Sequence, residues 1–405
     1  MRHLTWRSMI VAVSCLGWAG AAAAEGDADR AWNQFRGPDR TGISNETGWS
    51  VEGKSEPVWS KNVGLGYSGL SIADGRLYTL GYDEAKEEDV IYCLDALTGK
   101  EVWTHRYPSA IWNRAHRGGT LSTPTVDGDV VYFSDREGKF FCFEAATGKV
   151  VWKKDLKAEY NLTYPTWGFS TAPFVLGDRV IMNVGKVIAF DKKTGREVWQ
   201  TSKNYGDAYA TPIEFDAQGT PALAIFNRTG LVLIAQKDGS QIAVFEWSIQ
   251  PYVNAAHPVV TGNKVFISSG YNHGCALLEH AGSDLKPLWT SKIMRTHMNA
   301  VTLWQDHLYG YDDSVFKCID LQGNEKWSVR GIGKAAHILA DGKLILLSGR
   351  GELIIAEATP EEFRELSRRK VLDGGQYWTT PVLLNGLIYV RNSNGDIVCL
   401  DHRGS

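Results

Sequence analysis

Residues 93–103 read CLDALTGKEVW, and the pattern returns as CFEAATGKVVW at residues 142–152 and as AFDKKTGREVW at residues 189–199. A shorter copy, CIDLQGNEKW, occupies residues 318–327. In each copy alternating apolar residues end one strand, a glycine-containing turn follows, and a tryptophan lies in the next strand. Glycine accepts the positive φ that such a turn needs. The block therefore predicts a β-hairpin that repeats along the chain.

A second hairpin signal precedes the block, as in PTVDGDVVY at residues 124–132. Two hairpins make a four-stranded antiparallel unit, and a repeat of about 40 residues is the size of one propeller blade. The predicted structural repeat consists of tryptophans spaced 38 to 49 residues apart and of three turn glycines: Trp59, Trp103, Trp152, Trp199, Trp247, Trp289, Trp327, Gly99, Gly148 and Gly195.

The two ends of the chain share one blade. The last unit, from Thr379 to Asp401, has only three strands, whereas residues 57–61 make a strand that no hairpin precedes. We expect this strand to join the last blade. The sequence thus predicts an all-β fold, an eight-bladed β-propeller of four-stranded antiparallel blades, whose ring is closed by the N-terminal strand in the C-terminal blade. Closure leaves only short, protected sheet edges.

The expected domain limits are a signal peptide at residues 1–24, an N-terminal arm at 25–55 and the propeller at 56–405. Basic residues near the start, an apolar run and four alanines ending at Ala24 are typical of a cleavable signal, with cleavage near Ala24. The apolar run is too short to span a bilayer comfortably. We therefore expect a periplasmic or secreted protein and not an integral membrane protein.

A short helix is expected as an insertion near residues 359–369. Thr359 is a suitable N-cap, Pro360 suits the first helical position, and Glu362 completes a capping box.

Charge and cysteine usage exclude several classes of protein. The net charge is −3 and no basic stripe is present, so a nucleic-acid partner is not expected. Five cysteines follow the expected cleavage site, and Cys93, Cys142, Cys318 and Cys399 occupy one repeat position in different blades. Residues in different blades lie too far apart to bridge, so these cysteines are predicted to be unpaired and buried.

The repeat block resembles the tryptophan-docking repeat of pyrroloquinoline-quinone (PQQ) propellers. WNQFRGP at residues 32–38, RGGTLSTP at 117–124 and WGFSTAP at 167–173 are similar to segments of exported bacterial PQQ-like repeat proteins. The resemblance implies either a quinoprotein alcohol dehydrogenase, which holds PQQ with calcium, or a propeller like the lipoprotein of outer-membrane assembly, which binds proteins. The chain has no adjacent Cys-Cys pair and matches no calcium or catalytic Asp motif of the dehydrogenases.

Loops that lead from one blade to the next are expected to gather on one face, around the channel mouth, where binding residues are common. His257 and His337 are expected at one repeat position facing the channel, with His297 nearby. The candidate ligand- or partner-binding residues in these loops are Trp112, His116, Arg117, Trp167, Tyr209, Asn254, His257, His297, Asn299, His337 and Trp378. Three histidines could ligate a metal, but no spacing signature indicates one, and no metal or catalytic residue is predicted.

Three roles for this face remain open: a packed plug, a binding surface, or a catalytic centre. The leading prediction is an exported monomeric scaffold, without cofactor or catalysis, that binds a protein, peptide or glycan through the channel face. The alternative is a minimal PQQ-dependent quinoprotein oxidoreductase with calcium, in which Arg117 and Trp167 contact the cofactor.

Overall fold

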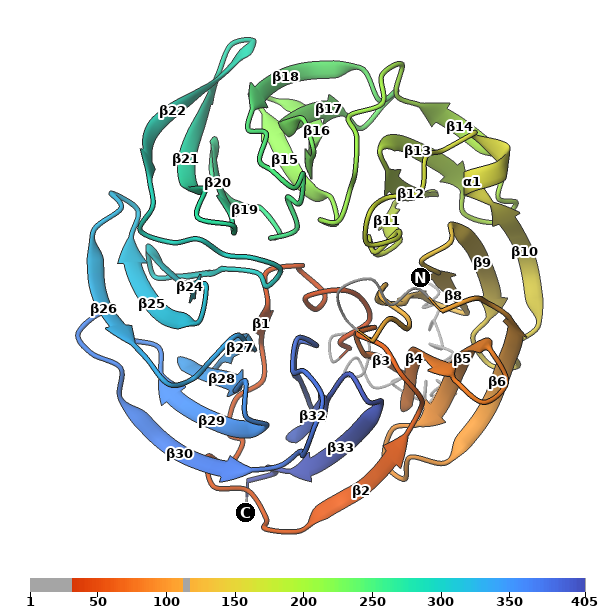
Figure 1. Ribbon diagram of the computed structural model, residues 1–405, viewed down its shortest axis with the longest axis vertical. Coiled ribbons are helices and arrows are strands. Elements are labelled where there is room, and N and C mark those ends of the chain that lie inside the picture. Colours follow the sequence, from red (N-terminus) through yellow and green to blue (C-terminus); the bar gives the residue numbers. More distant parts are fainter. Residues whose placement is uncertain (1–30, 112–116, 405) are drawn as a thin grey trace, which may run out of the picture.

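Eight antiparallel sheets surround a common axis in the computed structural model, which describes residues 31–111 and 117–404 (Figure 1). The predicted all-β, eight-bladed propeller is confirmed. The expected signal peptide, Trp112 and His116 lie outside the described residues.

Blades 1 to 4 each contain four strands, which follow one another from the axis outward. They are β3 (Ser71–Ala73), β4 (Arg76–Asp83), β5 (Glu88–Asp95) and β6 (Glu101–Pro108); β7 (Thr125–Asp127), β8 (Val130–Ser134), β9 (Lys139–Glu144) and β10 (Val150–Asp155); β11 (Phe174–Leu176), β12 (Arg179–Val184), β13 (Lys186–Asp191) and β14 (Glu197–Gln200); and β15 (Ile213–Ala217), β16 (Thr220–Asn227), β17 (Gly230–Ala235) and β18 (Gln241–Glu246).

Blades 5 to 8 repeat this plan, with an added strand in blade 7. They are β19 (Val259–Thr261), β20 (Lys264–Ser269), β21 (Gly274–Ala281) and β22 (Asp284–Ser291); β23 (Thr302–Trp304), β24 (His307–Asp312), β25 (Val315–Asp320) and β26 (Glu325–Val329); β27 (Ala336–Ala340), β28 (Lys343–Leu347), β29 (Glu352–Glu357) and β30 (Glu365–Lys370), with β1 (Ile43–Ser44) parallel to β27; and β31 (Val382–Leu384), β32 (Leu387–Arg391), β33 (Asp396–Asp401) and β2 (Pro57–Asn62).

A short helix, α1 (Leu156–Glu159), follows blade 2. Within the described residues, no helix combines the length and apolar character that crossing a membrane requires.

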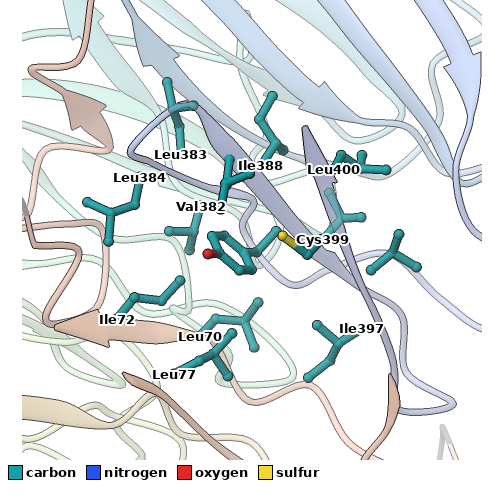
Figure 2. Close-up of a cluster of buried hydrophobic side chains, with 14 of the residues drawn as sticks. Leu70, Ile72, Leu77, Val382, Leu383, Leu384, Ile388, Ile397, Cys399 and Leu400 are labelled. Atoms are coloured by element: carbon teal, nitrogen blue, oxygen red, sulfur yellow. The ribbon is translucent and has the colours of Figure 1, made fainter. Parts of the chain in front are cut away.

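The ring closes in the way the sequence predicts. Strand β2 pairs antiparallel with β33, and Trp59 lies opposite Cys399. Apolar residues of blade 8 and of blade 1 form one buried core across this closure, in which Ile397 and Leu77 take part (Figure 2).

Tryptophans of the outermost strands clamp most blades to the next. Trp59 Nε1 donates to the Ala96 carbonyl at 2.9 Å, and Trp103 Nε1 donates to the Ala145 carbonyl at 2.9 Å. The indole of Trp59 also lies against Gly99, where a Cβ would fall 2.7 Å from the ring. This turn glycine is therefore required twice, for its φ of +68° and for the close approach of the indole.

Trp247 is not part of this clamp, which corrects its place in the predicted repeat. In blade 1 the docking position is Trp103, opposite Cys93 beside a bulge, and the equivalent position of blade 4 is Ala243, opposite Leu233. Trp247 comes four residues later and donates its Nε1 to Ser269 Oγ at 3.0 Å. Ala243 and Trp247 both lie about one blade length after Trp199, so the spacing of the tryptophans alone does not distinguish the two positions.

The expected helix near residues 359–369 is wrong. Residues 365–370 form β30, which pairs with β29 and completes blade 7. The preceding loop brings Phe363 edge-on to the docking Trp327, with ring centroids 5.5 Å apart. Trp327 Nε1 donates to the Thr359 carbonyl at 2.8 Å. Backbone hydrogen bonds to β29 stabilise residues 365–370 as a strand more than the capping signal at Thr359 stabilises a helix.

Residues 49–54 fill the junction between blades 7 and 8. Ser367 holds the docking position of blade 7 in place of a tryptophan, and it donates to the Val51 carbonyl at 3.2 Å. On the other side, the Ser50 N–H donates to the His402 carbonyl, and Trp49 is buried in the shared core. The arm is thus built into the ring.

The predicted state of the cysteines is confirmed. Cys93, Cys142, Cys275, Cys318 and Cys399 are all free and buried. Burial raises the pKa of the Cys93 thiol to about 11, so the group stays neutral.

A buried ion pair joins blades 1 and 2. Arg136 donates to both oxygens of Asp89 at 2.9 and 3.1 Å, and both side chains are almost fully buried. Asp135 beside them accepts the N–H groups of Glu137 and Lys139 through one oxygen, while its second oxygen is buried and has no hydrogen-bond partner within residues 31–111 and 117–404. Burial, and then the charge of Asp89, raise the pKa of Asp135 to about 7.

Removing the closing indole tests the clamp. Trp59→Ala is expected to lower the free energy of unfolding by about 3–5 kcal/mol, because a large buried ring and its hydrogen bond are lost. Urea unfolding followed by circular dichroism measures the change. Val58→Ala, at the exposed neighbouring position, should stay within about 0.5 kcal/mol of the wild type. Equal losses for the two variants would contradict a specific role of Trp59.

Asp135→Asn tests the buried carboxyl through pH. The folded-state pKa of Asp135 lies above the unfolded value, so the native state holds the extra proton and the stability of the wild type falls as pH rises from about 4 to above 7. The amide cannot ionise and keeps the accepting oxygen. We expect the variant to gain more than about 1 kcal/mol over the wild type at pH 8 relative to pH 4.

Urea titrations at the two pH values give this difference. Asp178→Asn, at an exposed position, is the matched control and should show no such gain. A variant that parallels the wild type at both pH values would show that Asp135 is ionised in the folded protein.

Candidate functional site

A cavity of about 350 Å3 lies among the loops that precede the innermost strands of every blade except blade 7. Since these strands surround the axis, the cavity is axial. Its walls are rich in aromatic side chains: Phe35, Tyr67, Trp167, Tyr209, Tyr271 and Trp378. Tyr271 is 45% exposed, so the walls are reached from solvent. This axial cavity is the candidate site.

One wall is a stacked aromatic pair. The rings of Tyr67 and Trp378 have centroids 5.0 Å apart and planes inclined by 23°. Tyr67 donates its hydroxyl to Gln376 Oε1 at 2.5 Å, which fixes the phenol ring. The stacked pair forms part of the cavity lining.

Another part of the wall, before blades 3 and 4, is held by hydrogen bonds between neighbouring loops. The Tyr209 hydroxyl donates to Asp207 Oδ2 at 3.3 Å and accepts the Trp167 N–H at 3.4 Å. Burial raises the pKa of the Tyr209 hydroxyl, so it stays protonated. The next turn, at Phe169, is held against blade 2 because the Phe169 N–H donates to the Arg136 carbonyl at 2.9 Å.

His297 is a titratable side chain in the cavity lining, and its pKa lies below neutrality. Burial, and then the charge of Lys334, lower its pKa to about 4, so the imidazole is neutral at pH 7. Its ring packs edge-on against Tyr271, with centroids 4.4 Å apart. Its Nδ1 is buried with no hydrogen-bond partner among the described residues. A neutral imidazole offers one donor and one acceptor to a ligand.

The N-terminal arm forms the floor of the cavity. The arm crosses the middle of the ring and reaches blade 7 through β1 (Figure 1). On the way Trp32 forms a two-bond bridge with Ile72 of blade 1, and the Asn33 carbonyl accepts the Val126 N–H of blade 2. Phe35 projects from this arm into the cavity lining. The segment that resembled other PQQ-like proteins therefore acts as a channel plug.

Arg36 anchors the plug with a buried guanidinium. It donates to the Thr41 carbonyl, to the Val301 carbonyl at 2.9 Å and to Thr302 Oγ1 at 3.4 Å. Burial lowers its pKa to about 9, so it remains charged at pH 7. The arm is thereby tied to blade 6.

The structure brings five of the predicted site residues into the cavity lining. These residues are Trp167, Tyr209, His297, Asn299 and Trp378. Arg117 is described outside this lining, where it forms an exposed ion pair with Glu84 at 2.9 Å and donates to Asn394 at 3.1 Å.

Three other predicted residues serve the framework, which corrects their expected place. Asn254 is buried and donates to the carbonyls of Asn227 and Trp247. His257 is buried edge-on against Phe35, beside the plug. His337 is buried against Phe316 of blade 6, with centroids 5.2 Å apart.

His257 and His337 also do not share one repeat position. Thr261 and Ala340 are equivalent, because each pairs with the first residue of the next strand. Counting back four residues from each makes Ala336 the equivalent of His257. His337 is therefore offset by one residue and faces the neighbouring blade, since side chains alternate along a strand. The three histidines do not converge as a metal site would require.

Sequence reasoning missed Phe35, Tyr67 and Tyr271. Phe35 lies in the arm and Tyr271 in the turn between β20 and β21, neither of which is a loop between blades. The WNQFRGP segment, which resembles other PQQ-like proteins, contains Phe35 and could have indicated a functional role for it. Only the structure places the arm across the channel (Figure 1).

The residues of the cavity do not fit PQQ with calcium. The flat wall suits a planar quinone, but the three carboxylates of PQQ need cationic or N–H donors, and calcium needs several oxygen ligands. None of the described lining residues is Asp, Glu, Lys or Arg. Across residues 31–111 and 117–404, no three His, Cys, Asp or Glu side chains gather as metal ligands.

Comparisons with solved structures agree on the fold. BamB from Moraxella catarrhalis superimposes with a TM-score of 0.60 at 17% identity, covering 86% of this chain and 98% of that one. Quinohemoprotein alcohol dehydrogenase from Comamonas testosteroni superimposes with a TM-score of 0.68 at 13% identity, covering 94% and 82%. At such identities the likeness shows the fold alone.

Comparisons of sequence point to the same family. Quinohemoprotein alcohol dehydrogenase ADH-IIG of Pseudomonas putida is 28% identical over 155 residues, which are 35% of this chain and 20% of that protein. The match thus spans about a fifth of that relative's length. A family model described as outer membrane protein assembly factor BamB matches residues 86–329, more than half of the chain. The chain therefore belongs to this family of PQQ-like propellers.

Proposed function

We propose that this protein is an exported, non-catalytic propeller that holds a protein partner against its loop-rich face. The observation that carries the proposal is the axial cavity, which has aromatic walls on several blades and a floor closed by the arm. Buried tryptophans and tyrosines in pockets dominate the affinity of many protein interfaces. The family description as an assembly factor supports a protein partner, and the expected signal peptide supports export.

The alternative, a PQQ-dependent oxidoreductase, is favoured by the matched segment of the alcohol dehydrogenase. It requires side chains that bind an anionic cofactor and calcium, and the described cavity lining offers neither. The uncharged lining is therefore the reason to prefer binding over catalysis.

Loss of a partner on removal of the aromatic walls tests the proposal. We expect Trp167→Ala/Trp378→Ala to reduce capture of the native partner at least tenfold, because the anchoring pocket loses both indoles. Immobilised wild type and variants are compared by quantitative mass spectrometry of captured proteins from the source cells. Val151→Ala, on the exposed outer strand β10, is the matched control. Equal capture by the double variant and the wild type would count against the loop-rich face.

An activity assay separates the alternative. Purified protein supplied with PQQ, calcium and primary alcohols should not reduce an artificial electron acceptor above the rate without protein. Sustained alcohol-dependent reduction that Trp167→Ala abolishes would overturn the non-catalytic assignment.

A further inference from the structure

We infer that His402 is a proton-sensitive latch at the junction between blades 7 and 8. While its imidazole is neutral it holds arm residues 49–54 in the ring, and when the imidazole is protonated it releases them. The inference concerns the closure of the ring and is independent of the proposed function. It rests on the hydrogen-bond partners of the two ring nitrogens.

The junction between blades 7 and 8 is closed without a docking indole. Ser367 holds the docking position of blade 7, and its hydroxyl donates to the Val51 carbonyl at 3.2 Å. At the junction between blades 1 and 2, Trp103 donates to a backbone carbonyl instead. Neither an indole nor a carbonyl titrates near neutral pH, so a junction of that kind does not respond to protons. The junction between blades 7 and 8 is built around a histidine.

Arm residues 49–54 enclose His402, which is 1% exposed. Gly53 lies against the imidazole, where a Cβ would fall 2.6 Å from Nε2. The Trp49 ring is tilted toward the imidazole, with centroids 6.4 Å apart. The Ser50 N–H donates to the His402 carbonyl at 2.6 Å. The segment that fills the junction therefore also surrounds the histidine.

The partners of the two ring nitrogens fix the protonation state of His402. Nδ1 lies 2.7 Å from the Ser50 carbonyl, which can only accept, so Nδ1 carries the hydrogen. Nε2 lies 2.9 Å from Nη2 of Arg369, which can only donate, so Nε2 keeps its lone pair. A second proton would bind at Nε2. It would turn the hydrogen bond with Arg369 into a contact between two donors and two positive charges.

The surroundings of the imidazole oppose this second proton. Burial lowers the pKa of His402, the hydrogen bond to Ser50 raises it in part, and the charge of Arg369 lowers it further. Lys343 of β28 lies 5.6 Å over the Trp49 ring and brings no compensating negative charge. Once the arm segment leaves, the ring regains the ordinary histidine pKa of about 6.5. Closure is therefore strongest above this pH and weakens as pH falls below it.

The neighbouring carboxylates do not offset the added charge. Asp401 is already paired with Lys54 at 2.6 Å and with Arg403 at 2.7 Å. These two partners hold the pKa of Asp401 well below its usual range, so Asp401 stays ionised while His402 titrates. Glu52 is exposed on the arm, where its charge acts on Arg369.

Repulsion of Arg369 would cost the arm a second contact. The Arg369 guanidinium also donates to the Lys54 carbonyl, so its displacement loosens both the histidine and the end of the segment. The upstream part of the arm is held elsewhere: Arg36 donates to a carbonyl of blade 6 and Arg40 to a carbonyl of blade 3, both at 2.9 Å. The latch therefore opens residues 49–54 and leaves the plug in place.

Hydrogen–deuterium exchange of the full chain tests the latch. Exchange is measured by mass spectrometry at pH 7.5 and pH 5 and corrected for the intrinsic rate at each pH. We expect the protection of residues 49–54 to fall about fivefold or more at pH 5, while residues 31–44 keep theirs. Equal protection of residues 49–54 at both pH values would overturn the inference, and so would an equal loss in both segments.

Two variants assign the effect to the contact between His402 and Arg369. His402→Gln keeps an oxygen that can accept from Arg369 and takes up no proton in this range, so the protection of residues 49–54 should not depend on pH. Arg369→Gln removes the opposing charge, and the fall should shrink to less than about twofold. His307→Gln, at a partly exposed position at the start of β24, is the matched control and should keep the full fall.

Circular dichroism at both pH values establishes that each variant is folded. A fall in His402→Gln as large as that of the wild type would overturn the role of His402. If His402→Gln does not fold, Arg369→Gln decides, and an undiminished fall in that variant would overturn the latch.

Discussion

The contact between an indole and the turn of the next blade is the interaction on which the structure depends. Trp59 and Tyr389 both donate to the Ala96 carbonyl, and Trp103 and Tyr78 both donate to the Ala145 carbonyl. One backbone acceptor thus ties two strands of one blade to the next. Because this contact fixes the angle between blades, it also fixes the loops at the channel mouth, and aromatic residues there can form a cavity instead of a mobile surface.

The junctions without a docking tryptophan show what else can close the ring. Between blades 4 and 5 the Trp247 indole donates to Ser269, whose hydroxyl in turn donates to Asn254. Between blades 7 and 8 the arm enters as a wedge around Trp49 and Val51. The same arm upstream plugs the channel. Ring closure and the floor of the cavity therefore depend on one continuous segment.

The sequence predicts what local chemistry determines and fails where distant segments decide. The turn glycines and alternating strands fix the blades, so blade number and closure follow from the repeat alone. The capping residues at Thr359 favour a helix locally, but Glu365–Lys370 pair with β29 as the outermost strand of blade 7, and the helix does not form. His337 is misplaced by one residue because its register depends on where the hairpin turns. Phe35 reaches the cavity only because the arm crosses the axis.

The plug also decides what kind of site the fold can offer. In this protein the arm crosses the channel and places Phe35 in the cavity lining, and the exposed Tyr271 marks an entrance for solvent. Desolvation behind that entrance lowers the pKa of His297 and raises that of Tyr209, so both side chains are neutral at pH 7. The family fold is compatible with enzymes and with scaffolds. The described lining of the cavity is aromatic and contains no Asp, Glu, Lys or Arg, and this is the feature on which the proposal of a binding protein rests.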